Sequence, residues 1–235
     1  LPNPPAHYYW RSLTYDIYTG RGWRTSTTES IQYKAGQPAL VDISTENPSI
    51  RLVEQKVYFS QDSLGVLFAT GLLVSADVDF EISWRVPAGD SADAFGASIQ
   101  ANSYTATSLL TLPGVNQMRV AKPVYPDWVI NRYLNLPENL PQRVRALAFD
   151  LTRSQTTPYD QALAIETYLR SYPYNLDVPA PPPTQDVADY FLFDLKQGYC
   201  DYYATAMVVL SRAAGLPARL VSGYASGSYD APNAR

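Results

Sequence analysis

One segment, Ala204 to Ala214, is apolar on almost every side when it is written as a helix, with Ser211 and Arg212 as its main interruptions. A helix that is hydrophobic on all faces lies inside a protein, so other elements must surround it. Gly198 and Cys200 come directly before this segment. Because glycine permits a sharp turn of the backbone, the sequence predicts that Cys200, the single cysteine, begins a buried helix.

The chemistry of Cys200 follows from that position. Unpaired N–H groups and the helix dipole favour an anion at a helix N-terminus, and a thiolate stabilised there has a lowered pKa and is a usable nucleophile. Asp201 directly follows the cysteine and opposes thiolate formation. Most free cysteines are inert, small core residues, so the residues alone leave a structural role open.

The second half of the chain shows helical periodicity. Val144, Leu147, Ala148 and Leu151 recur at helical spacing. Thr157 followed by Pro158 and Asp160 is a helix start signal. Asp186 to Leu195 is expected to form a further helix, and Pro179 to Pro183 an extended connector. Ala218 to Ala225 is expected to form a strand.

The first half shows period-two alternation between turn residues, which is typical of strands with one buried face. It predicts a small antiparallel sandwich or half-barrel. Trp10, Arg11 and Trp23 are expected to serve core packing or domain contacts rather than a binding surface. The expected strands are Leu13–Tyr18, Val53–Ser60, Gly65–Phe68, Asp79–Val86 and Ser103–Leu110.

These patterns predict two domains in an α+β chain. Residues 1–122 form an N-terminal β-rich domain. Residues 123–235 form helices followed by an antiparallel sheet packed against the cysteine helix.

The stretches Gly198 to Ala204 and Leu210 to Tyr224 resemble the nucleophile region of bacterial transglutaminase-like proteins, most nearly the extracytoplasmic domain of the membrane-anchored branch. Other matching motifs are Tyr9–Arg11, Tyr15-Asp16, Gly20–Trp23, Tyr125–Trp128, Tyr159–Leu169, Tyr172–Tyr174 and Asp189–Phe193. The resemblance implies a papain-like core preceded by the β domain. It also implies that Cys200 attacks glutamine carboxamides or peptide amides of protein substrates through a thioester, on the outer face of the cell membrane.

The chain departs from the family pattern in one respect. Members carry a histidine in a His-Ala-Trp strand and an acid in an Asp-Pro or Glu-Pro segment after the cysteine, whereas the only histidine here is His7. His7 matches no family position and is expected to be a surface residue of the N-terminal tail. We therefore expect a chain cut before its base and acid, with little catalytic activity of its own. Residues beyond about Gly223 are expected to be poorly ordered, because a lone strand is unstable.

Acyl transfer also needs hydrogen-bond donors for an oxyanion. The backbone N–H of Cys200 is one candidate. The resemblance and the position of two tyrosines, Tyr174 and Tyr199, make them candidates for a second donor or for walls of the cleft.

Composition excludes several other classes of function. The net charge is −4 and no basic cluster occurs, which argues against nucleic-acid binding. No ligand spacing for a metal and no cofactor motif is present, and no apolar run of about 18 residues spans a membrane. Membrane attachment is therefore expected only through segments outside this chain.

Two function classes remain open. One is a cysteine enzyme, either an acyltransferase or a protease or amidase of the same fold. The other is a non-catalytic module that binds proteins or cell-wall peptides. Glycan binding by the β domain would rest on aromatic content alone.

Overall fold

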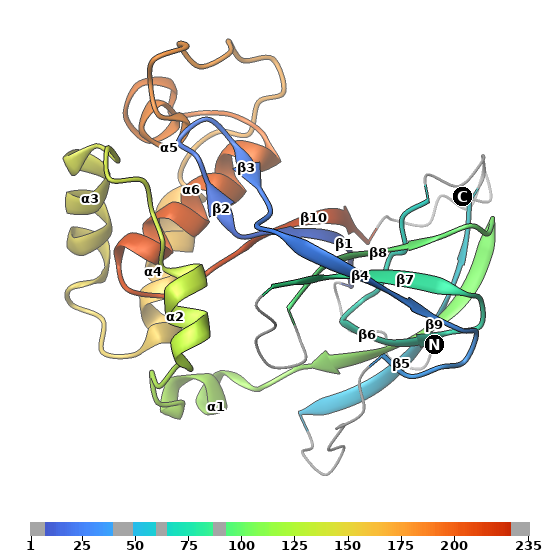
Figure 1. Ribbon diagram of the computed structural model, residues 1–235. Helices are drawn as coiled ribbons and strands as arrows, with labels where there is room; N and C mark the ends of the chain where they lie inside the picture. The colour runs from blue at the N-terminus through green and yellow to red at the C-terminus, as the bar shows by residue number, and fades with distance from the viewer. Residues whose placement is uncertain (1–7, 40–48, 60–64, 87–92, 227–235) are drawn as a thin grey trace, which may run out of the picture. The chain divides into compact units, whose positions relative to one another are not determined.

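A computed structural model describes residues 8–39, 49–59, 65–86 and 93–226 (Figure 1). Contacts group the chain into two compact units. The β unit comprises the described parts of residues 1–14, 27–113 and 221–235, and the helical unit comprises residues 15–26 and 114–220. The division predicted near residue 122 stays a prediction, and the grouping by contact differs from it at residues 15–26, at residues 114–122 and from residue 221 onward.

The β unit contains two three-stranded antiparallel sheets with strand orders β4-β7-β8 and β5-β9-β6. Side chains from both sheets, among them Phe80, Ile82 and Tyr104, form one buried cluster. This shared core confirms the sandwich interpretation. The strands are β4 (Thr28–Tyr33), β5 (Ile50–Tyr58), β6 (Leu72–Ala76), β7 (Phe80–Arg85), β8 (Ala94–Ile99) and β9 (Ser103–Thr111).

Three of the five predicted strands are found as β5, β7 and β9. The prediction for Gly65–Phe68 is wrong, because Gly65 has a φ of +73° and the segment makes only an isolated bridge at Val66. The prediction for Leu13–Tyr18 is divided at Asp16 between β1 (Tyr9–Tyr15) and β2 (Ile17–Tyr18).

The last described strand, β10 (Leu220–Ala225), pairs with β1 in the β unit. Tyr8 meets Ser226 and Ser12 meets Ser222 through hydrogen bonds, so the two strands run antiparallel. The expectation of a lone, unstable strand is therefore wrong for residues 224–226, since β1 supplies the partner of β10. The rest of that expectation, for residues 227–235, lies outside the described residues. The approach is close at Gly223, where a Cβ would lie 1.9 Å from the carbonyl oxygen of Trp10.

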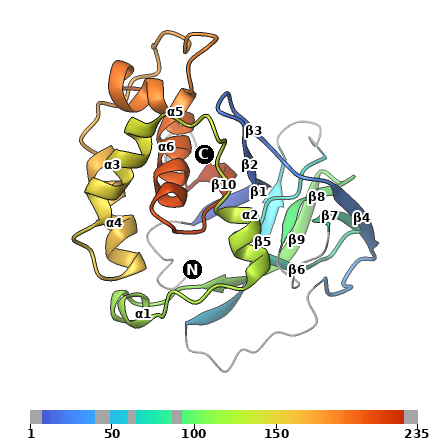
Figure 2. The same cartoon turned by 60° about the vertical axis from the view of Figure 1, so that its left-hand side comes forward.

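The helical unit packs three helices, α3, α4 and α6, against one another (Figure 2). Their contacting faces bury residues such as Val144, Ile165 and Val209 completely. The burial of α6 confirms the prediction from its apolar composition. The helices are α1 (Val115–Val120), α2 (Asp127–Tyr133), α3 (Gln142–Thr152), α4 (Pro158–Leu169), α5 (Val187–Asp189), η1 (Tyr190–Leu195) and α6 (Cys200–Ala213).

The helix predicted over Asp186–Leu195 exists but changes type. After α5, the segment η1 is a π-helix, and the N–H of Lys196 donates to the carbonyl of Phe191 at 2.9 Å. Lys196 then adopts a φ of +53°. The wide turn thus leads into the short loop that ends at Cys200.

A two-stranded hairpin of β2 and β3 (Trp23–Arg24) belongs to the helical unit. The indole of Trp23 donates to Thr205 at 3.0 Å and packs 5.1 Å from the ring of Tyr18, so Trp23 serves packing as predicted. Arg21 donates to the carbonyl of Pro182 at 2.7 Å and so anchors the proline-rich connector, which is neither helix nor strand.

Candidate functional site

Cys200 is the first residue of α6, as predicted, and it is exposed. The residue before it, Tyr199, is the N-cap with extended backbone. The N–H of Cys200 has no acceptor within the helix, because the first N–H groups of any helix lack one. An exposed thiol thus lies at the N-terminus of a buried helix.

Gly198 is required here for a different reason from the one predicted. Its φ is outside the left-handed region, but a Cβ would lie 2.9 Å from the ring of Tyr202. Tyr202 is buried and stacks on Phe191 at 5.6 Å. The glycine therefore allows the loop before Cys200 to lie directly on the first turn of α6.

A second segment lies along this loop. The N–H of Asn175 donates to the carbonyl of Gly198 at 2.7 Å, and the N–H of Gly198 donates to that of Pro173 at 3.3 Å. This parallel bridge places Tyr174 beside Gly198, two residues before Cys200. The Tyr174 side chain is near enough to the thiol to lower its pKa.

The other tyrosines near the thiol have packing contacts. Tyr203 donates to the carbonyls of Tyr172 and Pro173 at 2.8 and 2.9 Å, and its ring stacks on that of Tyr174 at 6.1 Å. The ring of Tyr199 lies edge-on to Tyr202 at 5.1 Å. Of the two tyrosines singled out from the sequence, Tyr174 is thus the one brought to the thiol; the roles of both stay predictions.

The pKa of the Cys200 thiol is raised, contrary to the expectation of a lowered value. Partial desolvation is the largest cause, and the charge of Asp201, which also hydrogen-bonds with the thiol at 3.5 Å, raises the pKa further. Hydrogen bonds from the Asp201 N–H and from Tyr174 lower it but do not compensate. In the described part of the chain, the thiol is therefore mainly protonated at neutral pH.

A pocket of about 440 Å³ adjoins Tyr174; we call it the α4–α6 pocket. It is open on the surface between α4, α6 and the segment that carries Tyr174. The residues that line it are Glu166, Leu169, Arg170, Tyr172, Tyr174, Tyr203, Ala204 and Met207. Of these residues, Tyr174 alone was predicted from the sequence to belong to the catalytic site.

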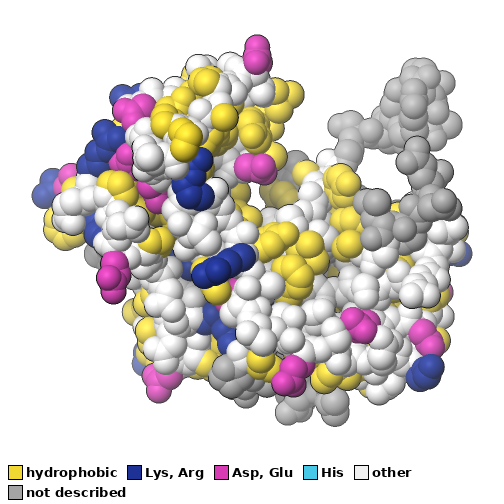
Figure 3. Space-filling view, turned by 45° about the horizontal axis from the view of Figure 1, so that its top comes forward, with side chains coloured by type: hydrophobic (Ala, Val, Ile, Leu, Met, Phe, Trp, Pro, Cys, Tyr) yellow, Lys and Arg dark blue, Asp and Glu magenta, His cyan; other side chains and the backbone are white. Residues whose placement is uncertain are grey.

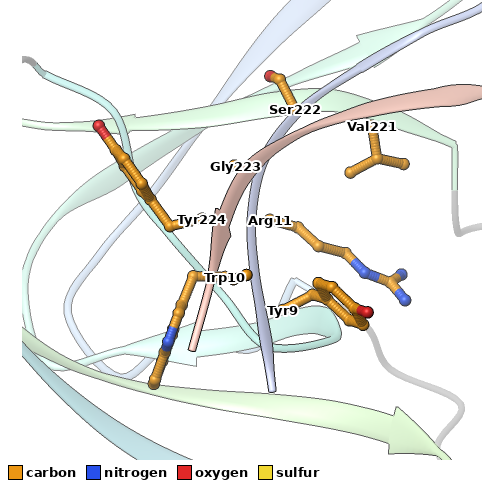
Figure 4. Close-up of a pocket in the computed structure, with 8 residues that line it drawn as sticks. Tyr9, Trp10, Arg11, Val221, Ser222, Gly223 and Tyr224 are labelled. Carbon is orange, nitrogen blue, oxygen red and sulfur yellow. The ribbon is translucent and has the colours of Figure 1, made fainter. Parts of the chain in front are cut away.

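The β unit has a separate pocket of about 400 Å³ on the β1–β10 ribbon (Figure 4). Trp10 and Tyr224 lie on one side of the ribbon, and Tyr9, Arg11 and Val221 lie on the other. Trp10 and Arg11 are both among the residues that line this pocket.

The described residues include no histidine, since His7 lies outside them. Among them, no group of three or more His, Cys, Asp or Glu side chains is arranged to hold a metal ion. No described helix is long and apolar enough to cross a membrane. On the face drawn in Figure 3, basic side chains lie among acidic ones.

Comparison with known proteins addresses the family. Residues 145–234, which include Cys200 and the helices around it, match the model of the transglutaminase-like superfamily. The chain contains a transglutaminase-like domain. Its fold of mixed helices and antiparallel sheets also resembles the periplasmic domain of TgpA from Pseudomonas aeruginosa, with a TM-score of 0.63 and 27% identity over 96% of this chain and 71% of that chain. The predicted α+β fold class is thereby confirmed.

Other relatives of this transglutaminase-like domain are longer proteins. The uncharacterized protein YebA of Bacillus subtilis is 34% identical over 94% of this chain and 32% of its own length. A protein-glutamine gamma-glutamyltransferase of Pseudomonas aeruginosa is 38% identical over 42% of this chain and 15% of its own length. The chain thus spans about a third or less of these curated relatives.

Proposed function

We propose that this transglutaminase-like domain supplies the nucleophile of a cysteine acyltransferase that acts on glutamine carboxamides of proteins. The observation that carries the proposal is Cys200 itself, an exposed thiol at the N-terminus of buried α6, with Tyr174 paired to the neighbouring Gly198. The relationship to a protein-glutamine gamma-glutamyltransferase supports the glutamine substrate.

In the proposed reaction, the Cys200 thiolate attacks the side-chain carbonyl carbon of glutamine. A carbon–sulfur bond forms, and the carbon–nitrogen bond breaks as the leaving nitrogen takes up a proton and departs as ammonia. A primary amine then attacks the thioester, transfers a proton to a base, and releases the thiolate with formation of a new amide. Water in place of the amine would give hydrolysis.

The developing oxyanion needs donors at the helix terminus. The N–H of Cys200 is the proposed first donor, and the Tyr174 hydroxyl, which lowers the pKa of the thiol, is the proposed second. Tyr199 is a weaker candidate, because its ring packs on Tyr202.

The proton transfers need a group that the described residues lack. The raised pKa of Cys200 means that an added base or cation must stabilise the thiolate at neutral pH. We propose that a histidine and an acid, in segments of the kind the family resemblance implies, fill these roles. We also propose an extracytoplasmic location, as for the periplasmic domain of TgpA, with membrane attachment through other segments.

The test uses a polypeptide that includes this chain and a following segment with histidine. It should incorporate a fluorescent primary amine into a glutamine-containing protein, and Cys200→Ala should abolish the incorporation. Incorporation at the wild-type rate by Cys200→Ala would refute the nucleophile assignment.

The raised pKa of the Cys200 thiol favours one alternative, a non-catalytic module that binds proteins or cell-wall peptides. In that case Cys200 would show no substrate-dependent chemistry in any length of polypeptide, while binding would persist in Cys200→Ala.

A further inference from the structure

The α4–α6 pocket and the Cys200 thiol share one face of α6. Cys200, Ala204 and Met207 are at positions i, i+4 and i+7, which align along a helix, and the latter two line the pocket. Tyr174 lines the same pocket and also acts on the pKa of the thiol. A substrate that reaches the thiol along this face therefore passes over the pocket.

Three tyrosines line the pocket, and the hydroxyls of two of them are engaged in hydrogen bonds to backbone carbonyls. The hydroxyl of Tyr203 donates to two backbone carbonyls. The hydroxyl of Tyr172 donates to the carbonyl of Leu192 at 2.6 Å. The third tyrosine, Tyr174, acts on the Cys200 thiol, whose pKa it lowers. The remaining wall is apolar, from Leu169, Ala204 and Met207.

The only charged groups of the lining neutralise each other. Glu166 and Arg170 form an ion pair at 2.7 Å, one turn apart on α4. The pocket therefore offers no unbalanced charge to a carboxylate or an ammonium group. It favours an uncharged, apolar occupant.

Size and distance restrict the occupant further. A cavity of about 150 Å³ holds a benzene ring, so about 440 Å³ accommodates a large aromatic side chain and part of the neighbouring backbone. With a rise of about 1.5 Å per residue, Ala204 and Met207 lie about 6 and 10 Å along the helix from Cys200. An extended peptide covers this distance in two or three residues.

Resting on the proposed function, we infer that the α4–α6 pocket binds a large apolar side chain, preferably aromatic, within about three residues of the reactive glutamine. The occupant is thus part of a polypeptide substrate. The pocket selects the sequence around the glutamine, and Cys200 performs the chemistry.

Binding is measured in Cys200→Ala, so that no turnover is needed. Fluorescent peptides carry one glutamine in a glycine background, with phenylalanine at each of the three positions on either side or at none. We expect the best phenylalanine peptide to bind at least about tenfold more tightly than the all-glycine peptide. Met207→Trp, which fills the pocket, should remove this preference, whereas Met118→Trp, at the other methionine of the chain and outside the pocket, should retain it.

Three results would overturn the inference: no preference for phenylalanine, a preference that survives Met207→Trp, or equally tight binding of acetyl-phenylalanine amide alone, which would indicate a small-molecule site. Failure of the proposed function looks different. A preference removed by Met207→Trp with no amine incorporation in the active polypeptide would leave the peptide site and refute the acyltransferase. Amine incorporation without any preference for phenylalanine near the glutamine would support the acyltransferase and refute the peptide site.

Discussion

At the scale of single residues, Cys200 combines two opposing effects. Its helix terminus and Tyr174 favour the thiolate, whereas desolvation and Asp201 favour the thiol and prevail. The sequence was sufficient to place the cysteine at the start of a buried helix and to identify Asp201 as unfavourable. It could not balance these effects, because both the burial of the thiol and the approach of Tyr174 depend on how segments distant in sequence pack around Cys200.

Asp201→Asn should lower the pKa of Cys200, since it removes the charge that raises it. The rate of iodoacetamide alkylation as a function of pH reports this directly, because the chain has one cysteine. The inflection should move to lower pH in Asp201→Asn and to higher pH in Tyr174→Phe, which loses a hydrogen bond that lowers the pKa. Asp127→Asn, the same change in the first turn of α2, is the control; an equal shift there would contradict the local assignment.

At the scale of elements, the sequence predicted the start of a helix from its capping residues, but it did not predict irregular backbone such as a π-helix or an isolated bridge. The start of α4 follows from Thr157, Pro158 and Asp160 in the sequence. The π-helix η1 has no such signature. A π-helix differs from an α-helix in the spacing of its backbone hydrogen bonds, which is one residue longer, and not in composition. Likewise, nothing in the alternation of Gly65–Phe68 distinguishes a strand from isolated bridges.

Thr157→Ala should destabilise the helical unit by about 1 kcal/mol, because the Thr157 hydroxyl oxygen accepts the N–H of Asp160 at 3.1 Å. Urea unfolding followed by circular dichroism measures the change. Thr167→Ala, an exposed position on the same helix, should change stability by no more than about 0.5 kcal/mol. Equal losses for the two variants would show that the cap is not the cause.

The ion pair between α3 and α5 should make stability depend on pH. Arg143 donates to the nearly buried carboxylate of Asp189 at 2.5 and 2.6 Å and holds the pKa of Asp189 below its usual value. A depressed carboxyl pKa stabilises the fold above the unfolded pKa, and this stabilisation is lost as pH falls through the folded pKa.

Arg143→Gln should therefore reduce the free energy of unfolding by about 2 kcal/mol at neutral pH. The difference from the wild type should begin to shrink as the pH falls below the usual carboxyl pKa of about 4. Below the depressed pKa of Asp189, the part contributed by the contact of Arg143 with Phe193, which does not titrate, should remain. Arg153→Gln removes an exposed pair with Asp150 and should have little effect at either pH. A difference for Arg143→Gln that is independent of pH would contradict the role of Asp189.

At the scale of the whole molecule, the class of each half was predictable and the grouping of its segments was not. Period-two and helical patterns separate the two halves, but the contacts group the β2–β3 hairpin with the helices and β10 with β1. Pairings between distant segments are not encoded in local periodicity. The α4–α6 pocket was not predicted for the same reason, because α4, α6 and the segment that carries Tyr174 come together only in the folded chain.

The central claim is that Cys200 forms a thioester with glutamine. Intact-mass spectrometry of an active polypeptide incubated with a glutamine peptide, without an acceptor amine, tests it directly. We predict an adduct with the mass of the peptide minus one ammonia, located on Cys200, released by hydroxylamine and absent from Cys200→Ala. An adduct on another residue, or amine incorporation that persists in Cys200→Ala, would contradict the account.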